Sequence, residues 1–269
     1  MSQKLTAPTR RNIILPAVRP NVGVEIAYQR KLDALIDRMS RDVDRAIRAT
    51  WRVKTPILAS DESSPTAFRA LFGKLGQEWE RKFSEFAQAE SRKFSGQAIN
   101  GADRALAASL RKAGFTVRFK MTPAANDVMQ ATIGEQVGLI KSIPEQYLTQ
   151  VQGAVMRSVQ VGRDLGSLSQ ELQDQFGVTK KRAAFIARDQ NNKATASITK
   201  ARQTELGITE AVWLHSAGGK QPRPTHVANN GKRYVIADGW LDPATNKRIW
   251  PGTEINCRCV SKSVIPGLD

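Results

Sequence analysis

The stretch that decides the fold runs from Ala211 to Asp269 and contains, in order, Trp213-Leu-His215, Arg223-Pro-Thr-His226, Asn230-Gly231, Trp250-Pro-Gly252 and Asn256-Cys-Arg-Cys259. Both cysteines of the protein lie there, together with the two histidines and several tryptophan, proline and glycine residues. Val212–His215 and Tyr234–Ile236 are short strand candidates, and the Asp-Gly and Pro-Gly pairs between them indicate turns. The preceding chain has helical periodicity. We therefore expect an α+β protein with a predominantly helical N-terminal and central region and a small, loop-rich C-terminal sheet module.

The composition narrows the class of protein. The 269 residues suffice for one large domain or two small ones. No apolar run reaches about 18 residues, so we expect no transmembrane helix and no membrane partner. The apolar run Ile13-Ile14-Leu15 is broken by Pro16 and Arg19 before it has the length of a signal peptide. Two cysteines separated by one residue do not make an extracellular disulfide framework, so a reducing cytoplasm is the expected site of synthesis.

The formal net charge is +16 and is unevenly distributed. Residues 1–120 hold 23 Lys and Arg against 12 Asp and Glu, and residues 177–269 hold 15 against 7. Residues 121–176 hold only 3 against 6. Two basic regions of this kind favour polyanions, nucleic acid first, without sequence readout. The alternative is that these side chains are solvated helix faces that serve solubility.

The helical part begins at Glu25, after an extended basic arm over residues 1–24 that we expect to become ordered only against a partner. Apolar residues recur every three or four positions from Tyr28 to Ile47, which predicts an amphipathic helix. A second helix carries an aromatic stripe from Phe68 to Phe94, which favours a packing seam over a stacking platform for single-stranded nucleic acid. A third helix, Gly101–Ala113, is expected to end at Gly114.

Strict alternation over Phe115–Met121 predicts a half-buried strand that ends at Thr122-Pro123. Further helices are predicted over Asn126–Ser142, from Pro144 onward, from Ser167 or Ser169 to Gly177, and over Lys180–Glu205 with Thr179 as its cap and Gly207 as its stop. The last of these is the most basic helix. Its cations, which are the nucleic-acid candidates, are Lys180, Lys181, Arg182, Arg188, Lys193, Lys200 and Arg202.

An ordered set of motifs in this chain resembles one known family. The set comprises Ile186-Ala-Arg-Asp-Gln190 with Lys193, Gly207-Ile208, Trp213, Arg223-Pro-Thr-His226, Gly231, Pro251-Gly252 and Asn256-Cys-Arg-Cys259. Over roughly residues 125–262 it is similar to the phage Mu F-like family of head morphogenesis, or minor head, proteins of tailed bacteriophages. The regions expected are the basic arm, a helical region with one strand over 25–124, the helical part of the Mu F-like domain over 125–207, and its sheet and loop module over 208–269.

This resemblance implies a structural virion component present in few copies. The implied partners are the portal protein, the major capsid protein or scaffold, packaged DNA bound nonspecifically, and further copies of the chain around the portal. The implied locations are the capsid interior at the portal vertex and, during assembly, the host cytoplasm. The alternative function is a metal-dependent nuclease or toxin-like enzyme built on a Mu F-like scaffold.

The histidines and cysteines also raise the question of a metal. His226, Cys257 and Cys259, with His215 as a fourth ligand, have the ligand types that zinc prefers, although the usual Cys-x-x-Cys spacing is absent. We expect no cofactor and leave zinc open as the alternative. A Cys257–Cys259 disulfide is disfavoured because so short a loop strains the bond.

The sequence supports a catalytic role for the module less well than a structural role. A metal nuclease with His226 as base and Asn229 or Asn230 orienting it lacks a visible second ligand set. A nucleophilic Cys–His pair lacks an oxyanion signature, and Gly218-Gly219-Lys220 lacks the rest of a phosphate-binding loop. We expect no catalytic residue. The motif residues are instead expected to lock loops by packing and hydrogen bonds, and they are Trp213, Arg223, Pro224, His226, Gly231, Pro251, Gly252, Asn256, Cys257, Arg258 and Cys259.

Overall fold

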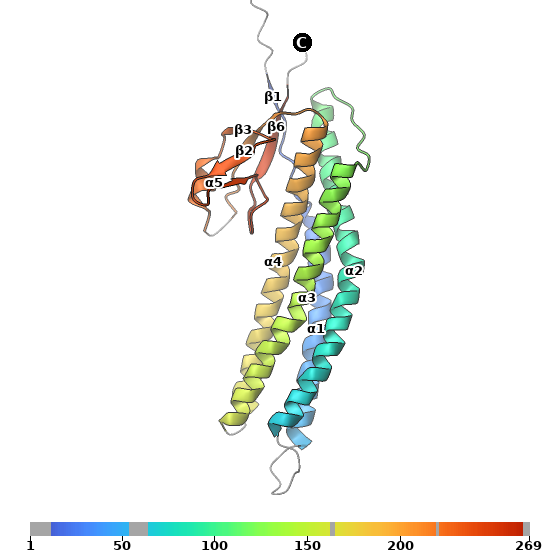
Figure 1. The fold of residues 1–269 in the computed structure, drawn as a ribbon, viewed down its shortest axis with the longest axis vertical. Helices are drawn as coiled ribbons and strands as arrows, with labels where there is room; N and C mark the ends of the chain where they lie inside the picture. Colours follow the sequence, from blue (N-terminus) through green and yellow to red (C-terminus); the bar gives the residue numbers. More distant parts are fainter. Residues whose placement is uncertain (1–11, 54–63, 162–164, 219–220, 266–269) are drawn as a thin grey trace, which may run out of the picture. The chain divides into compact units, whose positions relative to one another are not determined.

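The computed structural model describes residues 12–53, 64–161, 165–218 and 221–265. The chain forms two compact units, each assembled from separated segments. Unit 1 combines the chain up to Val22 with Ser95–Thr132 and Asp189–Asp269, and unit 2 combines Gly23–Phe94 with Ile133–Arg188. Long helices followed by a small antiparallel sheet confirm the predicted α+β class (Figure 1). Within the described ranges, no helix has the length and apolarity needed to cross a membrane.

Four long helices make up most of the chain: α1 (Val22–Val53), α2 (Ser64–Lys112), α3 (Pro123–Gln160) and α4 (Leu165–Glu205). The predicted breaks inside them are wrong. α2 continues through Gly101, α3 contains Pro144, and α4 contains Gly177. Pro144 removes one helical hydrogen bond, yet Ile143 and Tyr147 on either side of it are buried. Packing of a continuous apolar face therefore outweighs the local preference for a break.

The predicted caps inside α4 are wrong for the same reason. Thr179 lies in the middle of the helix, where its Oγ1 donates to the carbonyl of Gln175 at 2.8 Å. Ser167 and Ser169 are also helical. The predicted stops beyond the helices are confirmed at Gly114 and Gly207, which have φ of +90° and +70°. The predicted loop over 61–65 and turn over 162–166 fall largely outside the described residues.

Unit 2 is a helical bundle made from parts of these four helices (Figure 1). The aromatic stripe of α2 faces its interior, where Phe68, Trp79 and Phe83 are almost fully buried. Trp51 and Tyr28 of α1 make tilted ring contacts with Phe68 and with Phe94. The stripe is therefore a packing seam, as the spacing predicted.

Unit 1 contains two sheets whose described strands are all antiparallel. The larger has the order β1-β6-β2-β3 and the smaller pairs β4 with β5. Their bounds are β1 Ile13–Ile14, β2 Glu210–Leu214, β3 Arg233–Val235, β4 Trp240–Asp242, β5 Lys247–Ile249 and β6 Val260–Ile265, with the short helix α5 (Pro224–Ala228) between β2 and β3. In the central pair, Trp213 lies opposite Ser261.

The arm prediction needs correction for residues 12–22. Ile13 and Ile14 pair with Ile265 and Val264 of β6, and the amide of Leu15 donates to the carbonyl of Ser263 at 2.9 Å. Leu15 is buried in the core of unit 1. This segment is thus ordered by its own chain without a partner, whereas residues 1–11 of the arm lie outside the described residues.

The strand predicted over Phe115–Met121 is also wrong. The segment has no strand assignment, although Phe115, Val117 and Phe119 are partly buried against the unit 1 core and the residues between them are exposed. The amide of Phe115 donates to the carbonyl of Leu110 and so closes α2. Alternating burial is therefore real here, but it is produced by a connection that packs on one side without pairing to a neighbouring strand.

The core of unit 1 joins residues from its helices to the inner faces of both sheets. Trp213 is 1% exposed and contacts the rings of His226, Tyr234 and Trp240 edge-on. Cys257 and Cys259 belong to the same buried cluster. Both cysteines are free thiols, so the core places two sulfur atoms beside a buried histidine.

Candidate metal centre

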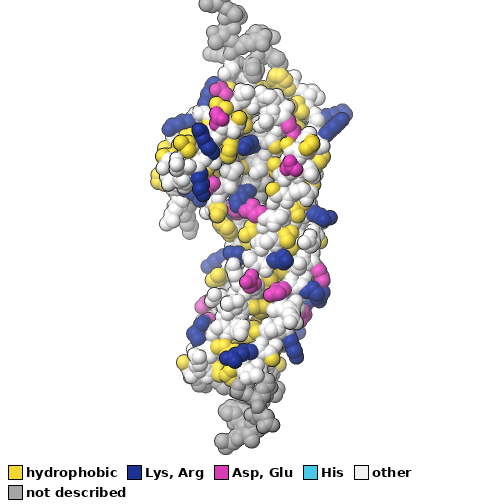
Figure 2. Space-filling view, in the orientation of Figure 1, with side chains coloured by type: hydrophobic (Ala, Val, Ile, Leu, Met, Phe, Trp, Pro, Cys, Tyr) yellow, Lys and Arg dark blue, Asp and Glu magenta, His cyan; other side chains and the backbone are white. Residues whose placement is uncertain are grey.

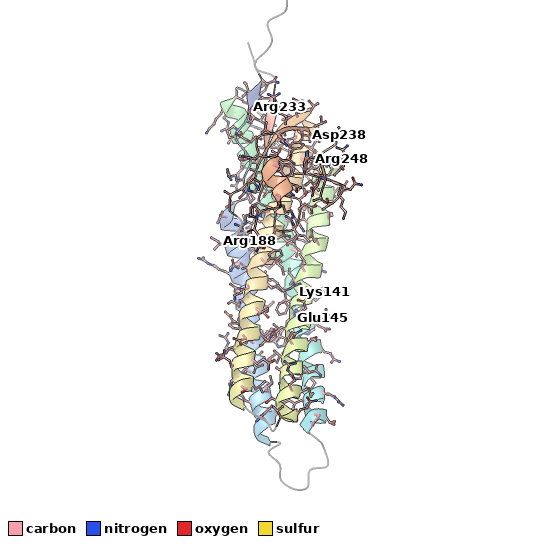
Figure 3. All side chains as sticks on the ribbon, turned by 90° about the vertical axis from the view of Figure 1, so that its left-hand side faces the viewer. Lys141, Glu145, Arg188, Arg233, Asp238 and Arg248 are labelled. Carbon is pink, nitrogen blue, oxygen red and sulfur yellow. The ribbon has the colours of Figure 1, made fainter. Side chains whose placement is uncertain are left out.

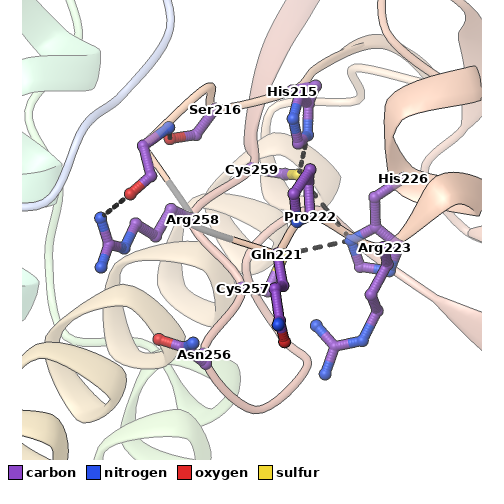
Figure 4. Close-up of a pocket in the computed structure, with 11 residues that line it drawn as sticks. His215, Ser216, Gln221, Pro222, Arg223, His226, Asn256, Cys257, Arg258 and Cys259 are labelled. Carbon is purple, nitrogen blue, oxygen red and sulfur yellow. Dashed lines mark hydrogen bonds between the residues drawn. The ribbon is translucent and has the colours of Figure 1, made fainter.

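Three separate segments of the terminal module (described residues 208–218 and 221–265) bring the histidines and cysteines together (Figure 4). His215 directly follows β2, His226 lies in α5, and Cys257 and Cys259 lie in the loop that leads into β6. The ligand atoms of His226, Cys257 and Cys259 all lie within 4.8 Å of one another. These three residues form the only group of at least three potential metal ligands among the described residues.

The contacts between these side chains converge on two atoms. Nδ1 of His226 lies 3.5 Å from Sγ of Cys257 and 3.8 Å from Sγ of Cys259. Sγ of Cys259 also lies 3.5 Å from Nδ1 of His215. His226 and both cysteines are buried, whereas His215 is half-buried. One nitrogen thus faces two sulfurs, and one sulfur faces two nitrogens.

Local sequence explains why His226 faces the sulfurs. Pro224 occupies the first turn of α5, where its missing amide costs nothing, and Arg223 precedes it in an extended conformation. The rings of Trp213 and His226 pack at nearly right angles, with 5.2 Å between their centroids. Gly231, at φ +81°, donates from its amide to the carbonyl of Trp213 at 2.8 Å. This turn returns the chain to β3 and holds β2 beside α5.

The loop that carries the cysteines is held to α4. The Asp189 carboxylate accepts a hydrogen bond from the amide of Asn256 and pairs with Lys193 at 3.1 Å. Nδ2 of Asn192 donates to the carbonyl of Cys257 at 3.1 Å. Asn256 adopts φ +58°, a conformation that Asn tolerates better than most residues.

Asp189 and Asn192 are the residues that sequence reasoning missed as parts of the site. In the sequence Asp189 stands out only as part of the family motif, and Asn192 carries no motif. Their signal is a polar row on one face of a helix, because residues three apart lie on the same side. Both are buried, and a buried polar row needs partners from another segment.

The pKa values of the two thiols are shifted in opposite directions. The hydrogen bond with Cys259, together with burial, raises the pKa of Cys257 to about 12. The same thiol–thiol hydrogen bond lowers the pKa of Cys259 to about 7, helped by the backbone amide of Ser216. One negative charge is therefore stabilised on the sulfur pair.

A pocket opens beside the cluster (Figure 4). Its polar lining includes Gln221, Arg223 and Arg258. Arg223 donates from Nη2 to the carbonyl of Ile255 at 2.9 Å, and Arg258 donates to the carbonyl of Gly218. The motif arginines therefore connect loops by hydrogen bonds, as the sequence predicted. The same loops also border an open pocket, which the sequence did not predict.

Pro251 and Gly252 lie in the turn that follows β5, and they allow this turn to approach α4 closely. Both are buried, and Gly252 has φ +88°. A Cβ at position 252 would lie 2.9 Å from Cβ of Ala196 and 3.0 Å from the carbonyl oxygen of Cys259. Only glycine fits here without displacement of α4 or of the cysteine loop.

Most of the predicted nucleic-acid cations of α4 make internal contacts. In unit 2, Lys180 pairs with Asp37 at 2.8 Å, Arg182 donates to Ser142 at 2.9 Å, and Arg188 lies over the Phe185 ring. Lys181 is the only exposed one of the seven. Figure 3 shows Arg188 on the α4 ribbon.

The prediction is wrong for Arg202. In unit 1 its guanidinium is 2% exposed and binds both carboxylate oxygens of Asp103, each at 2.9 Å, as well as Glu205 at 2.8 Å. A buried guanidinium of this kind cannot reach a phosphate. Lys200 lies 3.3 Å from the centroid of the Trp250 ring, and burial lowers its pKa.

The terminal module offers other cations. Lys232, Lys247 and Arg248 are exposed, and Lys and Arg side chains are prominent on the module face visible in Figure 2. Figure 3 shows Arg248 at the periphery of the module. The sequence does not single out these positions, because they are separate cations in loops and short strands, whereas α4 carries a dense series of them.

Comparison with known proteins gives a family for part of the chain. Residues 149–262 match the family described as phage Mu protein F like protein, which confirms the resemblance seen in the motifs. The chain is also 30% identical, over 260 residues, to an uncharacterized protein of Haemophilus influenzae, in an alignment that covers 94% of this chain and 55% of that protein. The chain therefore spans about half the length of this curated relative. No solved structure matches the present chain.

Proposed function

We propose, on the premise that residues 149–262 form a phage Mu protein F-like region, that this chain is a minor head protein of a tailed bacteriophage. It is incorporated in few copies during head assembly, at or near the portal vertex, and reaches the capsid interior from the host cytoplasm. The family match carries the proposal. Its partners are the portal protein, further copies of the chain, and the major capsid protein or scaffold.

The architecture of unit 1 supports docking over turnover. The cysteine loop is held to α4 by the buried contacts of Asp189 and Asn192. Two apolar side chains of the module, Val235 in β3 and Leu241 in β4, are 44% and 45% exposed. A module whose cysteine loop is held in one conformation loses little freedom when it binds a partner, which favours association. We assign the portal contact to the module and expect Val235 and Leu241 to take part in it.

Co-purification tests the portal contact. The full chain and a tagged portal protein from the same genome are co-expressed, and the tagged portal is isolated. The chain should be retained, and Val235→Glu with Leu241→Glu should reduce retention at least tenfold, because a charge must be desolvated at an interface. Val161→Glu is the matched control, since Val161 is 77% exposed and lies in unit 2. No retention of the unmutated chain would refute the portal contact.

The second candidate function is a metal-dependent nuclease. The pocket favours it, because Arg223 and Arg258 line the same opening as the Cys–His cluster and arginines bind phosphates. Plasmid DNA incubated with the protein and zinc, manganese or magnesium distinguishes the two functions. A minor head protein leaves the plasmid intact, whereas cleavage that His226→Ala abolishes would establish the nuclease.

A further inference from the structure

We propose that the terminal module binds one structural zinc ion through four side chains: His215, His226, Cys257 and Cys259. The proposal rests on the geometry of these side chains and is independent of the phage function. The ligand set of two imidazoles and two thiolates is one that zinc takes in closed, tetrahedral structural sites.

The distances have the values that a tetrahedral ion would impose. With zinc–sulfur bonds of about 2.3 Å and zinc–nitrogen bonds of about 2.05 Å, sulfur and nitrogen ligands on a tetrahedron lie about 3.6 Å apart. The three sulfur–nitrogen distances in the cluster are 3.5, 3.5 and 3.8 Å. An ion between these atoms would need little movement of the side chains.

Hydrogen bonds alone do not account for the arrangement. An imidazole nitrogen has one lone pair or one hydrogen and so directs one bond, yet Nδ1 of His226 lies close to two sulfurs. Its other ring nitrogen, Nε2, is buried and makes no hydrogen bond with any described residue. Among the described residues, the hydrogen-bonding contacts given for this buried ring are therefore those of Nδ1 with the two sulfurs.

His215 completes the ligand set. It lies outside the group of three whose ligand atoms are all within 4.8 Å of one another, but its Nδ1 already contacts Sγ of Cys259. It is half-buried directly after β2, and a rotation of its side chain would bring the imidazole to the ion. A fourth protein ligand leaves no open coordination position, which makes the site structural and not catalytic.

The ion would connect α5, which belongs to neither sheet, to the paired strands β2 and β6. β3, β4 and β5 have three residues each, and strands that short bury little apolar surface. Zinc would join the end of β2, α5 and the loop before β6 in one cross-link. Metal ligation can do this in a reducing compartment, where a disulfide does not persist.

Metal content and cobalt spectroscopy of the untagged full chain test the site. We expect about one zinc ion per chain after gel filtration, and cobalt substitution should give the visible absorption of a tetrahedral ion with a thiolate-to-cobalt charge-transfer band. A chelator should lower the melting temperature by about 10 °C, since tight binding to the folded state alone stabilises it. Absence of zinc with no cobalt spectrum in the folded chain would overturn the proposal.

Variants separate the ligands from their surroundings. Cys257→Ser, Cys259→Ser and His226→Asn should each lose at least nine-tenths of the zinc, and His215→Ala should lose it to a competing chelator that leaves the unmutated chain loaded. Gln221→Ala is the control, because Gln221 lines the same pocket and is exposed. If His215→Ala holds zinc as tightly as the unmutated chain, the four-ligand site is wrong. If a variant does not fold, the stoichiometry and spectrum of the unmutated chain decide the proposal.

Discussion

The side chain of Asn192 in α4 donates a hydrogen bond to the backbone carbonyl of Cys257, 3.1 Å away, and both residues are buried. This contact, with that of Asp189 to Asn256, fixes the loop that presents both cysteines. The geometry of the cluster therefore depends on a helix that provides none of its potential ligands.

Replacing Asn192 tests this dependence. Asn192→Ala leaves a buried carbonyl without its donor and should lower the free energy of unfolding by about 1–3 kcal/mol. Asn100→Ala is the matched control, because Asn100 is an exposed residue of α2 and its loss should change stability by about 0.5 kcal/mol or less. Urea unfolding of both variants gives the comparison, and equal stabilities would contradict the role given to Asn192.

Two glycines with similar positive φ, Gly231 at +81° and Gly252 at +88°, should respond differently to replacement by alanine. Gly231→Ala has open space around it and should cost only the strain of a positive φ, about 1–2 kcal/mol. Gly252→Ala meets Ala196 and the Cys259 carbonyl, so overpacking should add about 1–3 kcal/mol. Thermal unfolding of the two variants checks the order, and a larger loss in Gly231→Ala would show that the approach to α4 is not tight.

Removing one partner of the Arg202–Asp103 ion pair should lower the free energy of unfolding more than replacing both partners. Arg202→Met leaves Asp103 without its partner and should cost about 3 kcal/mol, whereas the double change Arg202→Met with Asp103→Leu should recover much of that loss. A double-mutant cycle in urea measures the coupling between the two positions. Additive effects would mean that the bidentate contact contributes nothing of its own.

Glu205 gives a pH dependence with a defined sign. Burial raises the pKa of its carboxyl, but hydrogen bonds from Thr122 and Arg202 outweigh this and hold the pKa below its ordinary value. A lowered folded pKa adds stability above the unfolded pKa of about 4.3, and this stability is lost as the pH falls through the folded pKa. The difference in melting temperature between the unmutated chain and Glu205→Gln should therefore be larger near pH 7 than near pH 3. A difference that grows on acidification would reverse the sign and reject the assignment.

Nonspecific DNA contact, if it occurs through the terminal module, should depend on three exposed cations. Replacing Lys232, Lys247 and Arg248 by alanine should weaken binding to random duplex DNA about tenfold or more and reduce its salt dependence. The control is the replacement of Arg30, Arg69 and Lys74, which removes the same charge from exposed positions of unit 2. Equal losses in the two triple variants would indicate a net-charge effect without a binding surface.

Regular spacing of apolar residues predicted the helices correctly. The effects of contacts between residues distant in the chain could not be predicted from local patterns. The amphipathic helix from Tyr28 and the aromatic seam of α2 follow from spacing alone. Pro144 and Gly177 predict helix breaks that the structure does not have, because local propensity does not include the packing that stabilises a continuous helix. The alternation at Phe115 indicated one-sided burial correctly, but a ladder requires a neighbouring strand that no local pattern reports.

The candidate site was foreseen in composition but not in geometry. Sequence identified His226, Cys257 and Cys259 as metal candidates, yet their convergence depends on the turn at Gly231 and on contacts from α4 residues far away in the chain. Arg202 shows the opposite case, since a cation on a basic helix was expected to face solvent and is instead buried by Asp103. Partners distant in sequence decide both outcomes.

The composition of assembled heads tests the central claim, that this chain is a minor head protein, most directly. Heads are purified from cells that express the complete head-gene set with and without this chain, and their proteins are quantified by mass spectrometry. The account predicts that the chain is present in each head at far lower copy number than the major capsid protein, and that heads formed without it are fewer or defective. Heads that lack the chain and are nevertheless normal in number and DNA content would contradict it.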